Sequence, residues 1–285
     1  MRHRLLTPLL ALSLLTASAL LPTVAATATT PLILAVHPYL PAAEIQKRFA
    51  PLAEYLSRTL GQPVTVRVGQ NYDKHIDAIG KDLVDIAFIG PAPYVKMLNK
   101  YGSKPLLARF ETKGSPNLYG VIFTRRESPL QILKDLRGKR FAFGDPESTM
   151  SHIVPRALLI DAGVPVSALQ EFKFLGSHHN VALAVLAGDF DAGAVKREVF
   201  DEFEAKGLRA LTVTPATPDH LFITRSTLPA AEVQKLRAAL LGLKDQPDGK
   251  EIMVALHKGL TALIPVQESD YEQLRAIVRQ IETSH

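Results

Sequence analysis

A short stretch with a glycine turn and three hydroxyl residues has the strongest potential for binding chemistry. Residues 144–151 read GDPESTMS and follow the apolar run 141–143, which predicts a buried strand leading into a helix. A helix start presents unpaired backbone N–H groups and the positive end of its dipole, so Ser148 and Thr149 there suit an oxyanion. Helix capping alone is the alternative, because Ser and Thr are ordinary caps.

A second strand-to-helix junction lies at residues 176–180, GSHHN. The adjacent His178 and His179 are poorly spaced for a metal on a helix, where ligands prefer positions i and i+4. We therefore expect no metal here. A donor to an anionic ligand is the functional interpretation, and a packed or solvated histidine is the alternative.

Two further turns follow apolar runs. Residues 90–93, GPAP, precede Tyr94, and His37-Pro38 precedes Tyr39. Each turn is weak evidence alone, since Gly and Pro mark turns in every protein. Four such turns at strand ends together indicate one binding region.

Catalytic motifs are missing from the sequence. It contains no G-x-S-x-G elbow, no G-x-x-x-x-G-K phosphate loop and no H-E-x-x-H zinc motif. We therefore expect a binding protein without a cofactor rather than an enzyme.

Apolar strand-like runs alternate with helical stripes, which predicts an α/β architecture with parallel strands and crossover connections. The predicted strands are 32–36, 64–68, 84–89, 119–123, 140–143, a segment near 172, 192–195 and 208–213. The predicted helices are 45–60, 75–79, one starting at Ser128-Pro129, 148–162, 233–243 and 271–281. Ligands in such sheets bind beyond the carboxyl ends of the strands.

One internal similarity suggests two related lobes. Residues 79–87, IGKDLVDIA, resemble residues 186–194, LAGDFDAGA. Both are a helix end, a glycine turn and an aspartate opening a strand. Two lobes facing each other at their strand ends would enclose a cleft.

Composition excludes several classes of protein. The 285 residues are 47% hydrophobic and 21% charged, as in ordinary globular proteins, and include no cysteine. Disulfide scaffolds, thiol nucleophiles, cysteine metal sites and lipidated cysteines are therefore excluded. The net charge of +5 is spread along the chain, so we expect no nucleic-acid partner.

The first 28 residues have the layout of a secretory signal peptide. A basic start with Arg2 and Arg4 precedes an apolar stretch, and Ala26-Thr27-Ala28 is one of two possible cleavage sites. Pro8 and scattered hydroxyls make a transmembrane anchor, the alternative, a poor fit. We expect cleavage and a periplasmic protein that is not a lipoprotein.

These segments resemble the phosphate/phosphite/phosphonate-binding proteins of ABC importers. The similar blocks are residues 72–73, 84–91 with 94, 119–123, 141–149, 154–159, 177–178, 182–188 and 191–195. The resemblance implies a type II periplasmic binding-protein fold, with two α/β lobes joined by two crossing strands. Its first lobe would take residues 29–120 and 216–285, and its second residues 121–215.

The resemblance also implies ligand-binding residues. Ser148 and Thr149 match the hydroxyl pair of the family, His178 matches its oxyanion-binding histidine, and Tyr39 and Tyr94 fall at aromatic positions lining the cleft. Many members continue the hydroxyl pair with Ser-Gly. Here Met150-Ser151 follows, which shifts one hydroxyl to Ser151, and His179 stands where an acidic residue is common.

The function implied is capture of a small phosphorus oxyanion for an ABC permease by a monomeric protein. Two alternatives stay open: a sensor presenting the oxyanion to a membrane kinase, and a periplasmic phosphate-ester hydrolase. Residues 195–198, VKRE, are more basic than acidic. An ammonium group in a dry site needs a carboxylate partner, so we expect phosphate, phosphite or an alkyl phosphonate to be preferred over an aminoalkyl one.

Overall fold

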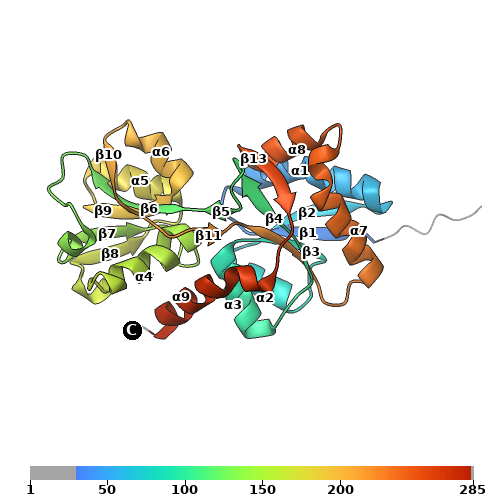
Figure 1. The fold of residues 1–285 in the computed structure, drawn as a ribbon, viewed down its shortest axis with the longest axis horizontal. Helices are drawn as coiled ribbons and strands as arrows, with labels where there is room; N and C mark the ends of the chain where they lie inside the picture. The colour runs from blue at the N-terminus through green and yellow to red at the C-terminus, as the bar shows by residue number, and fades with distance from the viewer. Residues whose placement is uncertain (1–29, 284–285) are drawn as a thin grey trace, which may run out of the picture.

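The computed structural model describes residues 30–283, so the predicted signal peptide lies outside the described residues. Two α/β lobes lie side by side, each built on its own sheet (Figure 1). We name them lobe 1, with the six-stranded sheet, and lobe 2, with the five-stranded sheet. Within residues 30–283, no helix combines the length and apolar character needed to cross a bilayer.

Lobe 1 has the strand order β13-β4-β12-β3-β1-β2. β1 pairs in parallel with β2 and β3, whereas β12 and β13 return antiparallel. The strands are β1 (Leu32–Val36), β2 (Val64–Val68), β3 (Ile86–Ile89), β4 (Leu106–Thr112), β12 (Leu221–Thr224) and β13 (Leu260–Ile264).

Lobe 2 has the order β10-β6-β9-β7-β8. β7 pairs in parallel with β8 and β9, and β6 runs antiparallel to β9 and β10. The strands are β6 (Gly120–Arg125), β7 (Arg140–Phe143), β8 (Glu171–Phe174), β9 (Ala192–Lys196) and β10 (Leu208–Val213). The predicted α/β class is confirmed, but both sheets are mixed because strands that enter or leave a lobe run against its parallel core.

The lobes are connected by two short crossing strands. β5 (Asn117–Leu118) pairs antiparallel with β11 (Thr217–Pro218), and residues 120–213 lie between them in the chain. The lobe limits near residues 120 and 215 stay a prediction, and the two crossing strands lie close to both positions in the chain.

Helices cover both faces of each sheet. In lobe 1, α1, α7 and α8 enclose one apolar core, and α2, α3 and α9 enclose another. In lobe 2, α5 and α6 cover one face and α4 packs on the other. The helices are α1 (Ala42–Leu60), α2 (Tyr72–Gly80), α3 (Pro91–Tyr101), α4 (Val154–Asp161), α5 (His178–Ala187), α6 (Arg197–Glu204), α7 (Ala230–Leu241), α8 (Gly249–Leu256) and α9 (Glu272–Thr283).

The C-terminal helix α9 touches both lobes. It lies along α3 of lobe 1 and α4 of lobe 2 (Figure 1). Its buried Leu274, Val278 and Ile281 share one core with Met150 and Ile153 of lobe 2. The lobes are therefore held together by apolar packing as well as by the crossing strands.

The prediction of a helix that starts at Ser128-Pro129 is wrong. Only a short 3₁₀ turn forms, at Leu133–Leu136. The Asp135 carboxylate accepts the backbone N–H groups of Gln131 at 2.7 Å and Ile132 at 3.1 Å. These bonds close a local turn instead of a helix.

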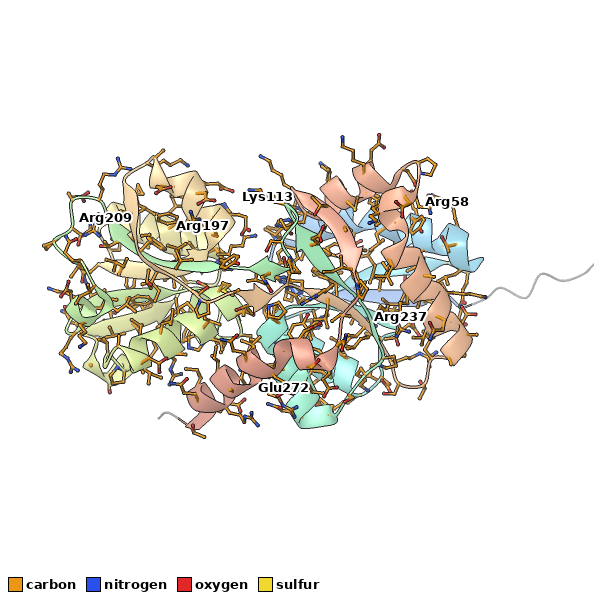
Figure 2. The ribbon with its side chains drawn as sticks, viewed as in Figure 1. Arg58, Lys113, Arg197, Arg209, Arg237 and Glu272 are labelled. Carbon is orange, nitrogen blue, oxygen red and sulfur yellow. The ribbon has the colours of Figure 1, made fainter. Side chains whose placement is uncertain are left out.

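Basic side chains are distributed over both lobes. Figure 2 shows Arg209 at the outer part of lobe 2 and Arg58 and Arg237 on lobe 1. Arg58 pairs with Asp248 at 2.6 Å, and Arg237 donates to a backbone carbonyl. Arg58 and Arg237 are therefore engaged locally.

Candidate functional site

The hydroxyl segment leaves β7 and enters a π-helical turn, η2 (Thr149–Ile153), that continues into α4. Ser148 is its cap, and its Oγ accepts the N–H of Ser151 at 3.1 Å. Gly144 is required here because a Cβ would lie 2.5 Å from the Ser151 hydroxyl oxygen. The Ser148 hydroxyl proton stays available, since capping uses the oxygen as an acceptor.

Thr149 links the two lobes. Its Oγ1 accepts the N–H of Ala92, in the first turn of α3, at 3.0 Å. Both residues are nearly fully buried. Accepting this bond leaves the Thr149 O–H free to donate, and it polarises the hydroxyl toward stronger donation. Capping and ligand binding are therefore compatible at this segment.

Ser151 is placed differently from the other two hydroxyls. It is fully buried, and its Oγ donates to the carbonyl oxygen of Ala194 in β9. Its proton is thus engaged in holding η2 against the sheet. A role for Ser151 as a ligand donor stays a prediction that this geometry does not favour.

His178 begins α5, directly after the cap residue Ser177, whose Oγ accepts the N–H of Asn180 at 3.1 Å. His178 is half-buried as a residue, and its Nδ1 accepts the backbone N–H of Lys196 at 3.0 Å. Burial, followed by the charges of Lys196 and His179, lowers the pKa of His178 to about 3. The ring is therefore neutral, with its proton on Nε2 as a permanent donor.

A wall of stacked rings faces these groups from lobe 1. His37, just after β1, stacks on His220 with centroids 5.2 Å apart, and on Phe88 at 5.5 Å. Tyr39 and Tyr72 flank His37 at 4.9 and 5.3 Å. Burial raises the pKa of Tyr39 to about 12, so its hydroxyl keeps its proton.

Tyr94 does not belong to this wall. It is fully buried and packs edge-on against Tyr271, with centroids 4.9 Å apart. Its hydroxyl has no hydrogen-bond partner among the described residues. Its neighbouring charges, Glu268, Arg275 and Asp270, all lie on the C-terminal segment. A ligand contact by Tyr94 stays a prediction, and Tyr39 and Tyr72 are the tyrosines placed beside His37.

Sequence reasoning did not name three groups at this junction as ligand-binding residues: His37, which it placed only in a turn, Lys196, which it counted only in the basic charge of residues 195–198, and His220. After burial itself, His220 and His75 lower the pKa of His37, and Lys196 lowers it further. Lys196 has no ion-pair partner within residues 30–283, so its charge is available to an anion. One local signal was present, an acidic residue beside a histidine at 219–220, directly before an apolar run.

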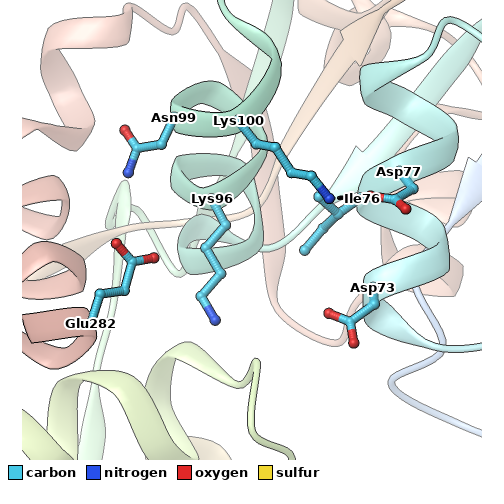
Figure 3. Close-up of a pocket in the computed structure, with 7 residues that line it drawn as sticks. All are labelled: Asp73, Ile76, Asp77, Lys96, Asn99, Lys100 and Glu282. Carbon is cyan, nitrogen blue, oxygen red and sulfur yellow. Dashed lines mark hydrogen bonds and ion pairs between the residues drawn. The ribbon is translucent and has the colours of Figure 1, made fainter. Parts of the chain in front are cut away.

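A cavity of about 380 Å³ lies elsewhere, between α2, α3 and the end of α9 (Figure 3). Its ionisable lining residues are Asp73, Asp77, Glu282, Lys96 and Lys100, and Lys100 pairs with Asp77 at 2.9 Å. Three carboxylates against two ammonium groups give no net attraction for an anion. The facing strand ends of the two lobes are the better oxyanion site.

Two α/β lobes, joined by paired crossing strands and facing each other with their strand ends, define a type II periplasmic binding protein. The structure of PhnD1 from Prochlorococcus marinus in complex with methylphosphonate shares this fold, with a TM-score of 0.79 and 21% identity over 88% of this chain and 98% of that one. Residues 34–271 match the family described as "ABC transporter, phosphonate, periplasmic substrate-binding protein". The chain belongs to this family.

Two relatives are similar in sequence. The "Phosphate-import protein PhnD" of Mycolicibacterium smegmatis is 32% identical over 170 residues, which are 56% of this chain and 53% of that protein. The "Phosphonates-binding periplasmic protein" of Escherichia coli is 24% identical over 224 residues, 74% of this chain and 66% of that protein. The chain thus spans about half to two thirds of the length of these relatives.

Proposed function

We propose that this protein captures a small phosphorus oxyanion between its lobes and delivers it to an ABC permease. The observation that carries the proposal is the convergence of free donors at the junction. Ser148 and Thr149 offer hydroxyls, His178 offers a fixed Nε2–H, and Lys196 adds a charge that forms no ion pair within residues 30–283. The names of the relatives, which concern phosphate and phosphonates, support the same ligand class.

The charges at the junction support a preference among phosphorus oxyanions. Glu147 pairs with Lys96 at 2.7 Å, and Asp219 accepts from His220 at 2.8 Å, so both carboxylates are engaged. Burial raises the pKa of Asp145, and the nearby Asp73 raises it further, which weakens Asp145 as a partner for a cation. We infer that phosphate, phosphite and alkyl phosphonates bind better than aminoalkyl phosphonates.

We also propose that the protein is exported and that it binds its ligand without catalysing a reaction. The predicted signal peptide would send the chain to the periplasm as a free monomer, where the ligand is bound without chemical change. Sequencing the N-terminus of the exported protein tests this part. Recovery of intact Met1 in a soluble periplasmic fraction would contradict cleavage.

A thermal-shift panel tests the ligand class. Ligand present at 100 times its Kd stabilises by about 2.7 kcal/mol, a clearly measurable shift. We expect phosphate, phosphite or methylphosphonate to give the largest shift, and 2-aminoethylphosphonate a smaller one. No shift with any phosphorus oxyanion would contradict the function. A largest shift from 2-aminoethylphosphonate, abolished by Asp145→Asn, would overturn the preference and assign Asp145 to the ammonium group.

A further inference from the structure

Two histidines at the junction hold their protons on opposite nitrogens. Nδ1 of His178 accepts a backbone N–H, so its proton sits on Nε2. Nδ1 of His220 lies 2.8 Å from Oδ1 of Asp219. A carboxylate can only accept, so Nδ1 of His220 carries a proton, and in the neutral form of the ring Nε2 is then an acceptor.

Nε2 of His220 lies close to Gly90, near the place where the hydroxyl segment meets lobe 1. A Cβ on Gly90, the cap of α3, would lie 3.4 Å from His220 Nε2. Two residues further along, Ala92 donates to Thr149 Oγ1. His220 Nε2 and the Thr149 hydroxyl therefore converge on the same helix start.

The Asp219–His220 pair is held rigidly. Asp219 is buried, and its Oδ1 also accepts the backbone N–H of His220 at 2.7 Å. The Asp219 carbonyl oxygen accepts the hydroxyl of Tyr271 at 2.8 Å, which fixes the loop from behind. The ring is further fixed by stacking on His37 and Phe88. His220 thus has no free rotation with which to present its other nitrogen.

We propose that the bound oxyanion shares one proton with Nε2 of His220, so that binding is linked to protons and selects protonatable phosphorus oxyanions over sulfonates. An unprotonated oxygen would meet a lone pair at Nε2 and be repelled. Either a P–O–H group donates to Nε2, or a protonated ring donates to P–O⁻. Both forms contain the same single proton, and no other bond changes.

This inference rests on the proposed function and adds a selection rule to it. A sulfonate has no proton to offer at any working pH and carries a single negative charge. It would depend entirely on protonation of His220. Asp219 is the ionisable group bonded to His220, and further ionisable groups lie around the ring. Those groups are His37 just after β1, His257 before β13 and His178 from lobe 2, with Lys196 near His37 and His178.

Calorimetric titration with methylphosphonate in buffers of different ionisation enthalpy counts the protons exchanged on binding. At pH 8, where the free ligand is mostly a dianion, we expect uptake of about one proton. At pH 6, where the ligand already carries the proton, we expect uptake near zero. Binding without uptake at pH 8 and with release at pH 6 would overturn the proposal. Absence of binding by every phosphorus oxyanion would overturn the proposed function, and this inference with it.

Variants test whether Nε2 of His220 is the atom that shares the proton with the bound oxyanion. In His220→Gln the side-chain amide can donate N–H without titrating, so uptake at pH 8 should vanish. The matched control is His179→Gln, because His179 is exposed and pairs with Glu202 at 3.1 Å on the surface of lobe 2. It should keep full uptake. Uptake that persists in His220→Gln would contradict the assignment.

Asp219 is a positioning residue, and its variant has a distinct readout. Asp219→Asn can donate to Nδ1, which lets the neutral His220 ring carry its proton on Nε2. Uptake at pH 8 should then fall below about half a proton while methylphosphonate still binds. Methanesulfonate should bind wild type at least about tenfold more weakly than methylphosphonate, from the loss of one charge-assisted bond. The ratio of the methanesulfonate Kd to the methylphosphonate Kd should be smaller in His220→Gln than in wild type. An unchanged ratio would contradict the selection rule.

Discussion

The two lobes contribute to the junction by different means. Lobe 2 presents donors from two short segments, residues 144–151 and 176–178, each lying between a strand and a helix start. Lobe 1 presents a wall of rings gathered from segments far apart in the chain, with His37 after β1, Tyr72 opening α2, Phe88 in β3 and His220 before β12. The donors of lobe 2 come from residues close together in the chain at helix starts, whereas the ring wall of lobe 1 is assembled by tertiary packing. We therefore expect lobe 2 variants to act on affinity and lobe 1 variants to act on stability and proton exchange.

The largest effect on affinity is expected at Thr149. Thr149→Val keeps the shape of the side chain but removes the donor to the ligand, and it leaves the buried Ala92 N–H unpaired. A charge-assisted bond contributes about 1.5–3 kcal/mol, so Kd should rise about ten- to a hundredfold. Calorimetric titration measures it, with Thr149→Ser as the control that restores the hydroxyl. If Val lowers the unfolding temperature but leaves Kd within about twofold, the side chain acts only in packing.

His178 should follow with a smaller loss. His178→Gln retains a side-chain N–H but not the ring geometry fixed by the Lys196 N–H, so Kd should rise about tenfold. His179→Gln, one residue along and exposed, should leave Kd unchanged. Equal effects from both variants would show that this helix start contributes general charge and not a directed donor.

Buried histidines should make the stability of the folded protein depend on pH. Burial lowers the pKa of His75 to about 4, below the ordinary value of 6.5, and the ring of His75, on α2, lies beside the wall, with its centroid 6.1 Å from that of His37. Burial also lowers the pKa of His152, in η2 of lobe 2, to about 4. Between these values the unfolded chain binds more protons than the folded one, so stability falls as pH falls from about 6.5 toward 4. Without ligand, we expect the Tm to drop by at least about 5 °C between pH 7 and pH 5, followed by circular dichroism.

His75→Gln measures how much this lobe 1 histidine contributes to the pH-dependent drop in Tm. Nε2 of His75 lies 3.1 Å from the Phe88 carbonyl, and the Gln amide can donate there without titrating. The pH-dependent drop in Tm should then shrink by about 3 °C, the share of one histidine. A drop of unchanged size would mean that the lobe 1 histidines do not control acid stability.

The smallest effect concerns the ion pair that joins the lobes. Lys96 of α3 and Glu147 of the hydroxyl segment are partly exposed, and such pairs contribute up to about 1 kcal/mol. Lys96→Met should therefore raise Kd by no more than about fivefold, and high salt should reduce the difference. A tenfold or larger loss would show that this pair, and not the hydroxyls, determines binding at the junction.

The sequence predicts well what short segments determine. Strands 64–68, 140–143 and 208–213 are confirmed at their ends, because each is mainly apolar and has a Gly or Pro within two residues of each end. Strands β4, β12 and β13 were missed, because they are held antiparallel in the lobe 1 sheet by partners that are mostly far away in the chain, which no local pattern reveals. The candidate site divides in the same way. Ser148, Thr149 and His178 are recognisable beside local turns, whereas His220 and Lys196 gain their meaning only from the opposite lobe.

A crystal structure of the complex with methylphosphonate tests the central claim most directly. We predict phosphonate oxygens within hydrogen-bond distance, about 2.5–3.2 Å, of Ser148 Oγ, Thr149 Oγ1 and His178 Nε2, with one oxygen facing His220 Nε2. The ligand would then lie between the donors of lobe 2 and the ring wall of lobe 1. Methylphosphonate bound instead among Asp73, Lys96 and Lys100, in the cavity of Figure 3, would contradict the account.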